Sequence, residues 1–180
     1  MRLPDKKKLI LAACLFTATL LITWILRIPL DIKRGEVSAG AYINLGDIGV
    51  FAAAVLLGGP IGALTAALSS AFADLFVGSA VYALPTLIIK GGMALLAAKL
   101  IKRDYAWRNL AKAVCVSGAV MMLGYFFFDL VIMGNYEVAA LSLPYNALQA
   151  IANGLISLPV LKIIGRLSCN EVEFNSSRVK

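Results

Sequence analysis

Three ionisable residues, Asp47, Asp74 and Lys90, lie among long apolar runs between residues 42 and 92. Carboxylates and an amine can act as acid, base or metal ligands, or can bind a polar substrate. A charge within hydrocarbon costs roughly 2.5–3.5 kcal/mol on insertion scales, so such residues usually face a polar cavity, a partner or a ligand. Asp47 opens an apolar run, where helix capping explains it equally well, whereas Asp74 lies near a helix end where the dipole disfavours a carboxylate. Asp74 is therefore the stronger functional candidate.

Lys90 lies about eight residues inside its apolar run, roughly 12 Å at 1.5 Å per residue. It can snorkel toward an interface from there. An ion pair with Asp74 or Asp129, or contact with a ligand, explains that depth at least as well.

Three amides near the C-terminus, Asn146, Gln149 and Asn153, are spaced i, i+3 and i+7. On a helix they share one face. Such a stripe can bind neighbouring helices, or it can offer donors and acceptors to a heterocyclic ligand.

The residue types that support the commonest catalytic chemistry are scarce. The chain has no histidine, which lowers the odds of a metal site or a catalytic triad. Its cysteines, Cys14, Cys115 and Cys169, have no short paired spacing, so we expect free, packed thiols rather than disulfides or a metal cluster. The turn at Gly58-Gly59-Pro60 is not a phosphate loop, because no Gly-Lys-Ser/Thr follows it.

The composition indicates an integral membrane protein. The 180 residues are 61% hydrophobic, with a mean hydropathy of +0.86, well above the composition of soluble domains. A spanning helix needs about 20 apolar residues, so five or six helices would use nearly the whole chain and leave no room for a soluble domain. We predict an all-α integral membrane protein, a six-transmembrane-helix bundle in one domain. The expected helices are 9–28, 47–58, 60–77, 82–101, 110–132 and 144–165.

The segments around these helices have distinct predicted roles. The first apolar run resembles a signal sequence, but it is too long and lacks a convincing small-x-small cleavage site, so a retained helix is favoured. The polar, Gly-containing stretch from Pro29 to Gly46 reads as a long loop. A second loop is expected from 134 to 144, and residues 166–180 read as a polar tail outside the membrane.

The distribution of basic residues predicts the orientation, because cytoplasmic loops carry an excess of Lys and Arg. With six spans, thirteen basic residues share a side with both termini and four fall on the opposite side or half-membrane. Both termini are therefore expected in the cytoplasm, and the net charge of +7 is attributed to orientation rather than to nucleic-acid binding. The thirteen are Arg2, Lys6, Lys7, Lys8, Lys99, Lys102, Arg103, Arg108, Lys112, Lys162, Arg166, Arg178 and Lys180; the four are Arg27, Lys33, Arg34 and Lys90.

This topology brings the unusual polar residues together on the extracytoplasmic side. Polar groups and aromatic rings that converge beside two long loops indicate a small-molecule pocket. Tyrosines in this layer can instead form the interfacial aromatic belt, as Tyr136 can. The predicted substrate-binding residues are Tyr42, Asn44, Asp47, Asp74, Tyr82, Lys90, Asp129, Tyr145, Asn146, Gln149 and Asn153.

Four blocks of sequence resemble the substrate-binding S components of energy-coupling factor (ECF) vitamin transporters, most closely those for riboflavin, hydroxymethylpyrimidine or vitamin B6 compounds. The resemblance covers nearly the whole chain. The blocks are Asn44-Leu45-Gly46-Asp47, Gly58-Gly59-Pro60-Ile61-Gly62, Ala73-Asp74-Leu75, and Tyr82-Ala83 through Pro85 to Ile89-Lys90-Gly91.

The resemblance implies a multi-pass subunit of a prokaryotic cell membrane that binds a vitamin on its outer side under the loops after helices one, three and five. It also implies partners, a transmembrane T component and two cytoplasmic ATPases that hydrolyse ATP, and toppling of the S component to release substrate. This chain would bind no cofactor of its own. Family members often present Ala-xxx-Ala on helix one to the T component; here Ala13-xxx-Thr17 or Cys14-xxx-Ala18 would have to serve.

The expected substrate is a pyridine or pyrimidine vitamin precursor such as pyridoxine, pyridoxamine or hydroxymethylpyrimidine, with riboflavin as the alternative. Amides can match ring nitrogens, carboxylates can accept from an aminomethyl or hydroxyl group, and tyrosines can stack on a small ring. Two other classes stay open. An integral membrane enzyme would turn a substrate over, and a scaffold would use the same polar groups only for helix packing.

Overall fold

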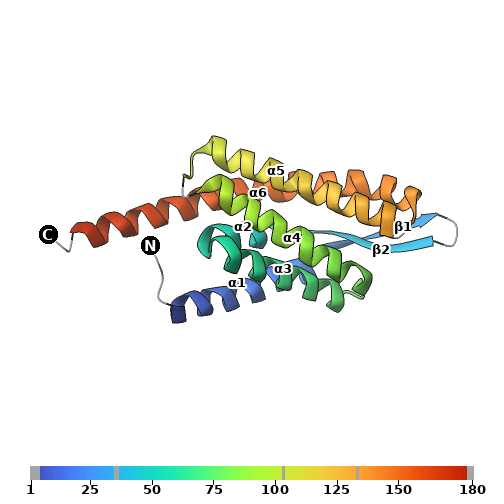
Figure 1. Ribbon diagram of the computed structural model, residues 1–180, viewed down its shortest axis with the longest axis horizontal. Coiled ribbons are helices and arrows are strands. Elements are labelled where there is room, and N and C mark those ends of the chain that lie inside the picture. Colours follow the sequence, from blue (N-terminus) through green and yellow to red (C-terminus); the bar gives the residue numbers. More distant parts are fainter. Residues whose placement is uncertain (1–4, 35–36, 103, 133, 178–180) are drawn as a thin grey trace.

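The protein is a bundle of long helices with a β-hairpin at one end (Figure 1). The computed structural model describes residues 5–34, 37–102, 104–132 and 134–177, and the side chains of 6–29, 42–102, 104–132 and 134–167. The elements, in chain order, are α1 (Asp5–Ile25), β1 (Arg27–Arg34), β2 (Val37–Asn44), α2 (Asp47–Leu56), α3 (Gly59–Phe76), α4 (Ala80–Ile101), α5 (Trp107–Phe127), the π-helical η1 (Phe128–Ile132) and α6 (Tyr136–Ser177).

Five helical segments of the described chain are long and apolar enough to cross a membrane: 6–25, 59–76, 80–101, 107–132 and 136–167. Between the first two, α2 has ten residues, about 15 Å of helix, half the ~30 Å hydrocarbon core. The second predicted span is therefore a short helix inside the bundle. The count of six spans stays a prediction.

The stretch predicted as a loop from Pro29 to Gly46 is instead an antiparallel hairpin, so the all-α prediction needs this correction. β1 pairs with β2 from Arg27 opposite Asn44 to Arg34 opposite Val37. The signal was present as a two-residue alternation, with Ile28, Leu30 and Ile32 separated by polar residues or proline. Proline is tolerated here because a two-stranded sheet has only edge strands.

The last helix is longer than predicted at both ends. Residues 136–144 and 166–177, expected as loop and tail, are helical in α6. The side chain of Asn135 accepts a hydrogen bond from the Val138 amide at 3.0 Å and so caps the start of the helix. Helix α4 begins at Ala80, two residues before its predicted start, and Pro85 lies in its second turn.

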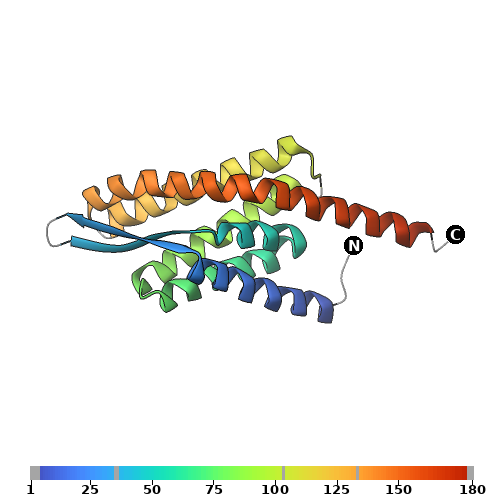
Figure 2. The ribbon, with the colours of Figure 1, turned by 180° about the vertical axis from the view of Figure 1, so that it is seen from behind.

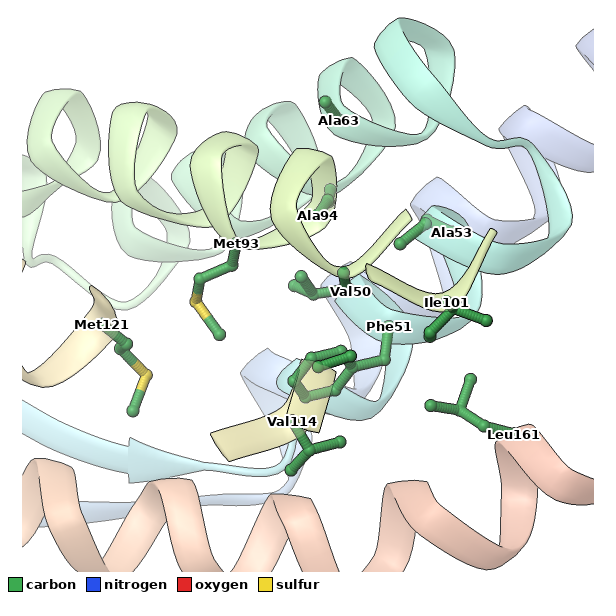
Figure 3. Close-up of a cluster of buried hydrophobic side chains, with 14 of the residues drawn as sticks. Val50, Phe51, Ala53, Ala63, Met93, Ala94, Ile101, Val114, Met121 and Leu161 are labelled. Carbon is green, nitrogen blue, oxygen red and sulfur yellow. The ribbon is translucent and has the colours of Figure 1, made fainter. Parts of the chain in front are cut away.

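Small residues let the helices pack closely around an apolar core (Figure 3). A Cβ added at Gly62 would lie 2.4 Å from the carbonyl oxygen of Ala53, so the backbones of α2 and α3 touch at this position. Helix α3 packs chiefly against α4, and α5 against α6. The core side chains drawn and labelled are Val50, Phe51, Ala53, Ala63, Met93, Ala94, Ile101, Val114, Met121 and Leu161.

The outer surface of the bundle is apolar, as a lipid-facing surface should be. Cys14 and Cys115 are free but exposed on this surface, so the prediction that they are packed was wrong; the side chain of Cys169 lies outside the described residues. Helix α1 begins and α6 ends at the same end of the bundle, opposite the hairpin (Figures 1 and 2). The side of the membrane that this end faces remains a prediction.

Candidate functional site

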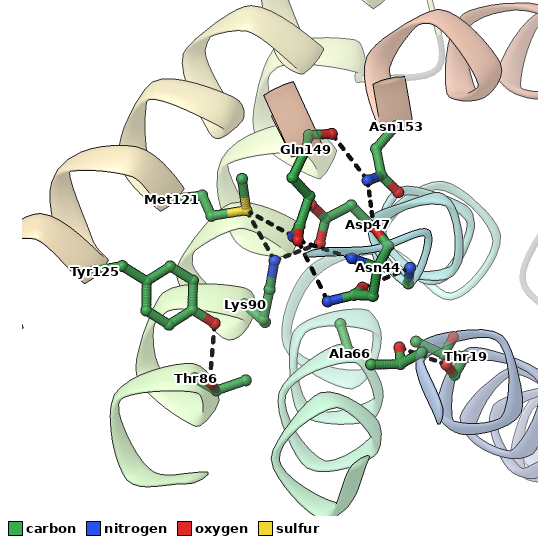
Figure 4. Close-up of polar contacts among 12 residues, drawn as sticks. Thr19, Asn44, Asp47, Ala66, Thr86, Lys90, Met121, Tyr125, Gln149 and Asn153 are labelled. Atoms are coloured by element: carbon green, nitrogen blue, oxygen red, sulfur yellow. Dashed lines mark hydrogen bonds and ion pairs between the residues drawn. The ribbon is translucent and has the colours of Figure 1, made fainter. Parts of the chain in front are cut away.

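A buried ion pair between Lys90 and Asp47 lies at the centre of the polar interior (Figure 4). Asp47 is 1% exposed and Lys90 3% exposed. Asp47 Oδ1 accepts from Lys90 Nζ, and Asp47 Oδ2 accepts from Gln149 Nε2 at 3.2 Å. Of the alternatives open for Lys90, the structure has an ion pair, but with Asp47 rather than with Asp74 or Asp129, because the short α2 begins deep in the bundle and presents its first side chain to the middle of α4.

Side-chain amides of α6 form hydrogen bonds with the end of β2, beside this ion pair. Gln149 Oε1 accepts from the backbone N–H of Asn44 at 3.0 Å, and Asn153 Nδ2 donates to the backbone carbonyl of Asn44 at 2.8 Å. The side chain of Asn44 in turn accepts from the Gly46 amide at 2.8 Å, at the turn into α2. Of the two roles left open for the amide stripe, Gln149 and Asn153 therefore connect neighbouring segments of the chain.

A second carboxylate, Asp74, lies beneath the hairpin and is only partly satisfied. The hydroxyl of Tyr42, on β2, donates to Asp74 Oδ1. Burial, followed by the adjacent Asp74 carboxylate, raises the pKa of the Tyr42 hydroxyl, which keeps it a donor. Asp74 is 3% exposed, and no donor meets its Oδ2 atom with hydrogen-bond geometry among the residues that the structure describes, although the Thr86 hydroxyl lies beside the carboxylate.

A third carboxylate, Asp129, belongs to the π-helical turn at the end of α5. Single π-turns inserted in helices are frequent at functional sites. Asp129 Oδ1 accepts from the Tyr82 hydroxyl and Oδ2 from the Ser142 hydroxyl, each at 2.9 Å. These bonds connect η1 to α4 and α6. Beside them, the hydroxyls of Thr86 and Tyr125 lie 2.8 Å apart.

These groups surround a cavity of about 60 Å³, several times the ~10–15 Å³ that one water needs. Nine of the eleven predicted binding residues line it; Asp47 and Asn153 lie behind its wall, in the polar network. Tyr136, the tyrosine assigned to the same layer, is exposed and lies outside the wall. The lining residues are Thr23, Tyr42, Ile43, Asn44, Ser70, Asp74, Tyr82, Thr86, Lys90, Tyr125, Asp129, Ser142, Tyr145, Asn146 and Gln149.

Sequence reasoning missed six of the lining residues, Thr23, Ile43, Ser70, Thr86, Tyr125 and Ser142. Single hydroxyls in apolar runs carry little information, because they can bond to their own helix, as Thr23 does with the Thr19 carbonyl at 2.7 Å. Tyr125 had a usable signal. It lies four residues before Asp129, hence on the same helical face.

The arrangement suits recognition of a small polar ring. Hydroxyls, carboxylates and amides provide donors and acceptors, and four tyrosines provide aromatic surface. Among the residues that the structure describes, no three acidic, cysteine or histidine side chains are grouped closely enough to hold a metal ion. The mixed polar and aromatic lining is typical of a pocket for a small polar ligand.

Three comparisons bear on the identity of the chain. A family model described as "ECF-type riboflavin transporter, S component" matches residues 5–166. A Pyrococcus woesei protein described as "Uncharacterized protein in gap 3'region" is 30% identical over 139 residues, 77% of this chain and 88% of the relative. A solved structure described as "Structure and mechanism of the S component of a bacterial ECF transporter" has the same fold, with a TM-score of 0.65 at 15% identity, over 94% of this chain and 99% of that one.

Proposed function

We propose that the cavity under the hairpin is a vitamin-binding site, since this chain belongs to the ECF-type riboflavin transporter S-component family. S components are membrane subunits that bind the substrate of an ECF transporter. The observation that carries the proposal is the cavity itself, which is lined by polar and aromatic side chains from α1, β2, α3, α4, α5, η1 and α6 inside an otherwise apolar bundle. Helix packing alone does not require such a cavity.

The proposed substrate is a pyridine or pyrimidine vitamin precursor. The cavity is small, and Asn146 and Asp74 in its wall offer the amide and carboxylate that a substituted ring nitrogen, aminomethyl or hydroxymethyl group would need. Riboflavin is the second candidate, favoured by the description of the matching family. The hairpin would cover either ligand, because Tyr42 and Asn44 of β2 form part of the cavity wall.

Transport requires partners in this proposal. A T component and two cytoplasmic ATPases would supply docking and ATP hydrolysis, and this chain would bind no cofactor. The proposed docking surface is the set of small side chains Ala13, Cys14, Thr17 and Ala18, all exposed on α1. The hairpin end would face outward and both termini the cytoplasm, following the distribution of basic residues.

Ala13→Trp tests the docking surface. A bulky ring on a surface that needs close helix approach should abolish co-purification with the T component and leave vitamin binding unchanged. Ala119→Trp, at an exposed alanine on α5, is the matched control and should retain the complex. Complexes that form equally well with both variants would remove α1 as the docking surface.

Mass spectrometry of small molecules released from the purified protein tests vitamin binding. We expect a vitamin or precursor that is missing from a mock purification of membranes without this chain. Added back at 100 times its Kd, it should stabilise the fold by about 2.7 kcal/mol. Reproducible release of only lipid, with no thermal shift from any vitamin, would contradict the proposal and favour a scaffold. Conversion of the vitamin by the purified chain would indicate an enzyme.

A further inference from the structure

The charged side chains in the cavity wall indicate which charge the ligand carries. This inference rests on the proposed vitamin-binding function. We infer that the ligand is a small aromatic ring that carries a protonated amine, and that Asp74 Oδ2 accepts a hydrogen bond from this amine. Asp129 lies in the same cavity wall and adds negative potential.

The charged side chains in the cavity wall are Asp74, Asp129 and Lys90. Lys90 is matched by its ion pair with Asp47, which lies behind the wall. The two remaining carboxylates have no ion-pair partner among the described residues. Arg27, a cation that acts on Tyr42 through its charge, donates through Nη1 to the carbonyl of Trp24 at 2.7 Å. The cavity wall therefore holds two carboxylates that no described ion pair includes.

The hydrogen bonds distinguish the three carboxylates. Both oxygens of Asp47 accept bonds, from Lys90 and Gln149, and both oxygens of Asp129 accept bonds from hydroxyls. Asp74 differs, because Oδ1 accepts from Tyr42 while no donor meets Oδ2 with hydrogen-bond geometry; the Thr86 hydroxyl beside this carboxylate bonds with Tyr125. A buried polar atom without a partner costs free energy, and most such atoms in proteins are satisfied. A donor on the ligand would satisfy Oδ2, and a charged donor would also offset the charge of Asp74.

The tyrosine rings in the cavity wall also favour a ligand with a positive charge. Tyr42, Tyr82, Tyr125 and Tyr145 all line the cavity. The face of Tyr125 is already covered by Lys90, whose Nζ lies 5.8 Å from the ring centroid. Tyr42 donates to Asp74 and Tyr82 to Asp129, and Tyr145 lines the same cavity. The negative face of a tyrosine ring attracts an ammonium group, most strongly where water is excluded. Carboxylate and aromatic surfaces thus favour the same ligand charge.

A matched pair of ligands tests the inference without any mutation. Pyridoxamine and pyridoxine share one ring and differ by an aminomethyl in place of a hydroxymethyl group. The purified protein, first stripped of endogenous ligand, should bind pyridoxamine at least about tenfold more tightly by titration calorimetry, equivalent to about 1.4 kcal/mol. Asp74→Asn should remove most of this preference, because its amide oxygen still accepts from Tyr42 while the charge is lost.

Asp104→Asn is the matched control variant. It removes an exposed carboxylate next to α5, where Asp104 accepts from the Ala106 amide, and should leave the tenfold preference intact. Thermal unfolding of each variant identifies a loss of fold, and the wild-type comparison stands if Asp74→Asn does not fold.

The outcomes separate this inference from the proposed function. Equal binding of the pair, or tighter binding of pyridoxine, overturns the cationic ligand and leaves vitamin binding in place. If the protein binds riboflavin but neither pyridoxamine nor pyridoxine, the cationic ligand is likewise overturned and vitamin binding stays in place. Failure of every vitamin to bind or to be released overturns both. A preference for pyridoxamine that survives Asp74→Asn overturns the assignment of Asp74 as the acceptor.

Discussion

Replacing Lys90 by methionine tests whether the central ion pair is structural. The substitution keeps a long side chain but leaves the carboxylate of Asp47, 1% exposed, with Gln149 as its remaining donor. Removing one partner of a buried ion pair typically costs about 3–5 kcal/mol, because an uncompensated charge stays buried. At about 2–4 °C per kcal/mol for a chain of this size, the thermal midpoint should fall by about 6–20 °C.

The double variant Asp47→Asn/Lys90→Met makes the test specific to charge. It removes both charges, and the asparagine oxygen can still accept from Gln149. We expect the double variant to be more stable than either single variant, since neutral replacement of a buried pair is often tolerated. Thermal unfolding in detergent, followed by circular dichroism, measures all three. Lys99→Met is the matched control, an exposed lysine on the same helix.

Two results would refute this reasoning. A Lys90→Met variant that loses less than about 1 kcal/mol would mean that Asp47 is solvated or neutral without its partner. Additive losses in the double variant would mean that the two side chains act independently. In either case Lys90 would be free to serve as a ligand contact, and it would add a positive charge to the cavity wall.

Two further substitutions test the packing and the hydrogen bonds, again by thermal unfolding. Gly62→Ala should destabilise the fold by about 1–3 kcal/mol, because its Cβ would meet the backbone of α2 at 2.4 Å. Gly92→Ala, with no described atom within 4 Å of its Cβ, should not; equal losses would contradict the close α2–α3 contact. Ser142→Ala should cost about 1–3 kcal/mol by leaving the η1 carboxylate one donor short. Ser157→Ala is its control on the same helix, since this buried hydroxyl bonds to no described residue, and a similar loss there would show that the carboxylate is not involved.

Much of the bundle was predictable because membrane helices require long apolar runs, and glycine residues often separate these runs. Gly58 and Gly78 lie where one predicted helix ends and the next begins, and they adopt φ of +70° and +82°, which most other residues avoid. The hairpin was not predicted, because β1 alternates polar and apolar residues over a short stretch and contains no long apolar run. The start of α6 was missed because its cap, Asn135, precedes a segment with few strongly apolar residues.

The site was predictable as a group of residues but not as a set of contacts. Placing Asp74, Tyr82 and Asp129 near helix ends at one side of the bundle was enough to bring them into one layer. Asp47 was assigned to that layer too, yet it meets Lys90, which lies ten residues into α4 and so about 15 Å along it. The length of α2 determines this depth, and no apolar pattern predicts that a helix will be short.

The polar interior divides into two parts with different physical roles. Around Asp47, every carboxylate oxygen and the Lys90 ammonium are engaged, and a ligand that entered there would have to break bonds of equal quality. Around Asp74, which lines the cavity, one buried acceptor has no donor with hydrogen-bond geometry. The hydrogen bonds around Asp47 hold the cavity wall in place before the ligand binds. Little conformational entropy is therefore lost on binding. Selectivity should then depend on the few groups whose hydrogen bonds are incomplete, foremost Asp74, rather than on Lys90, the most unusual residue in the sequence.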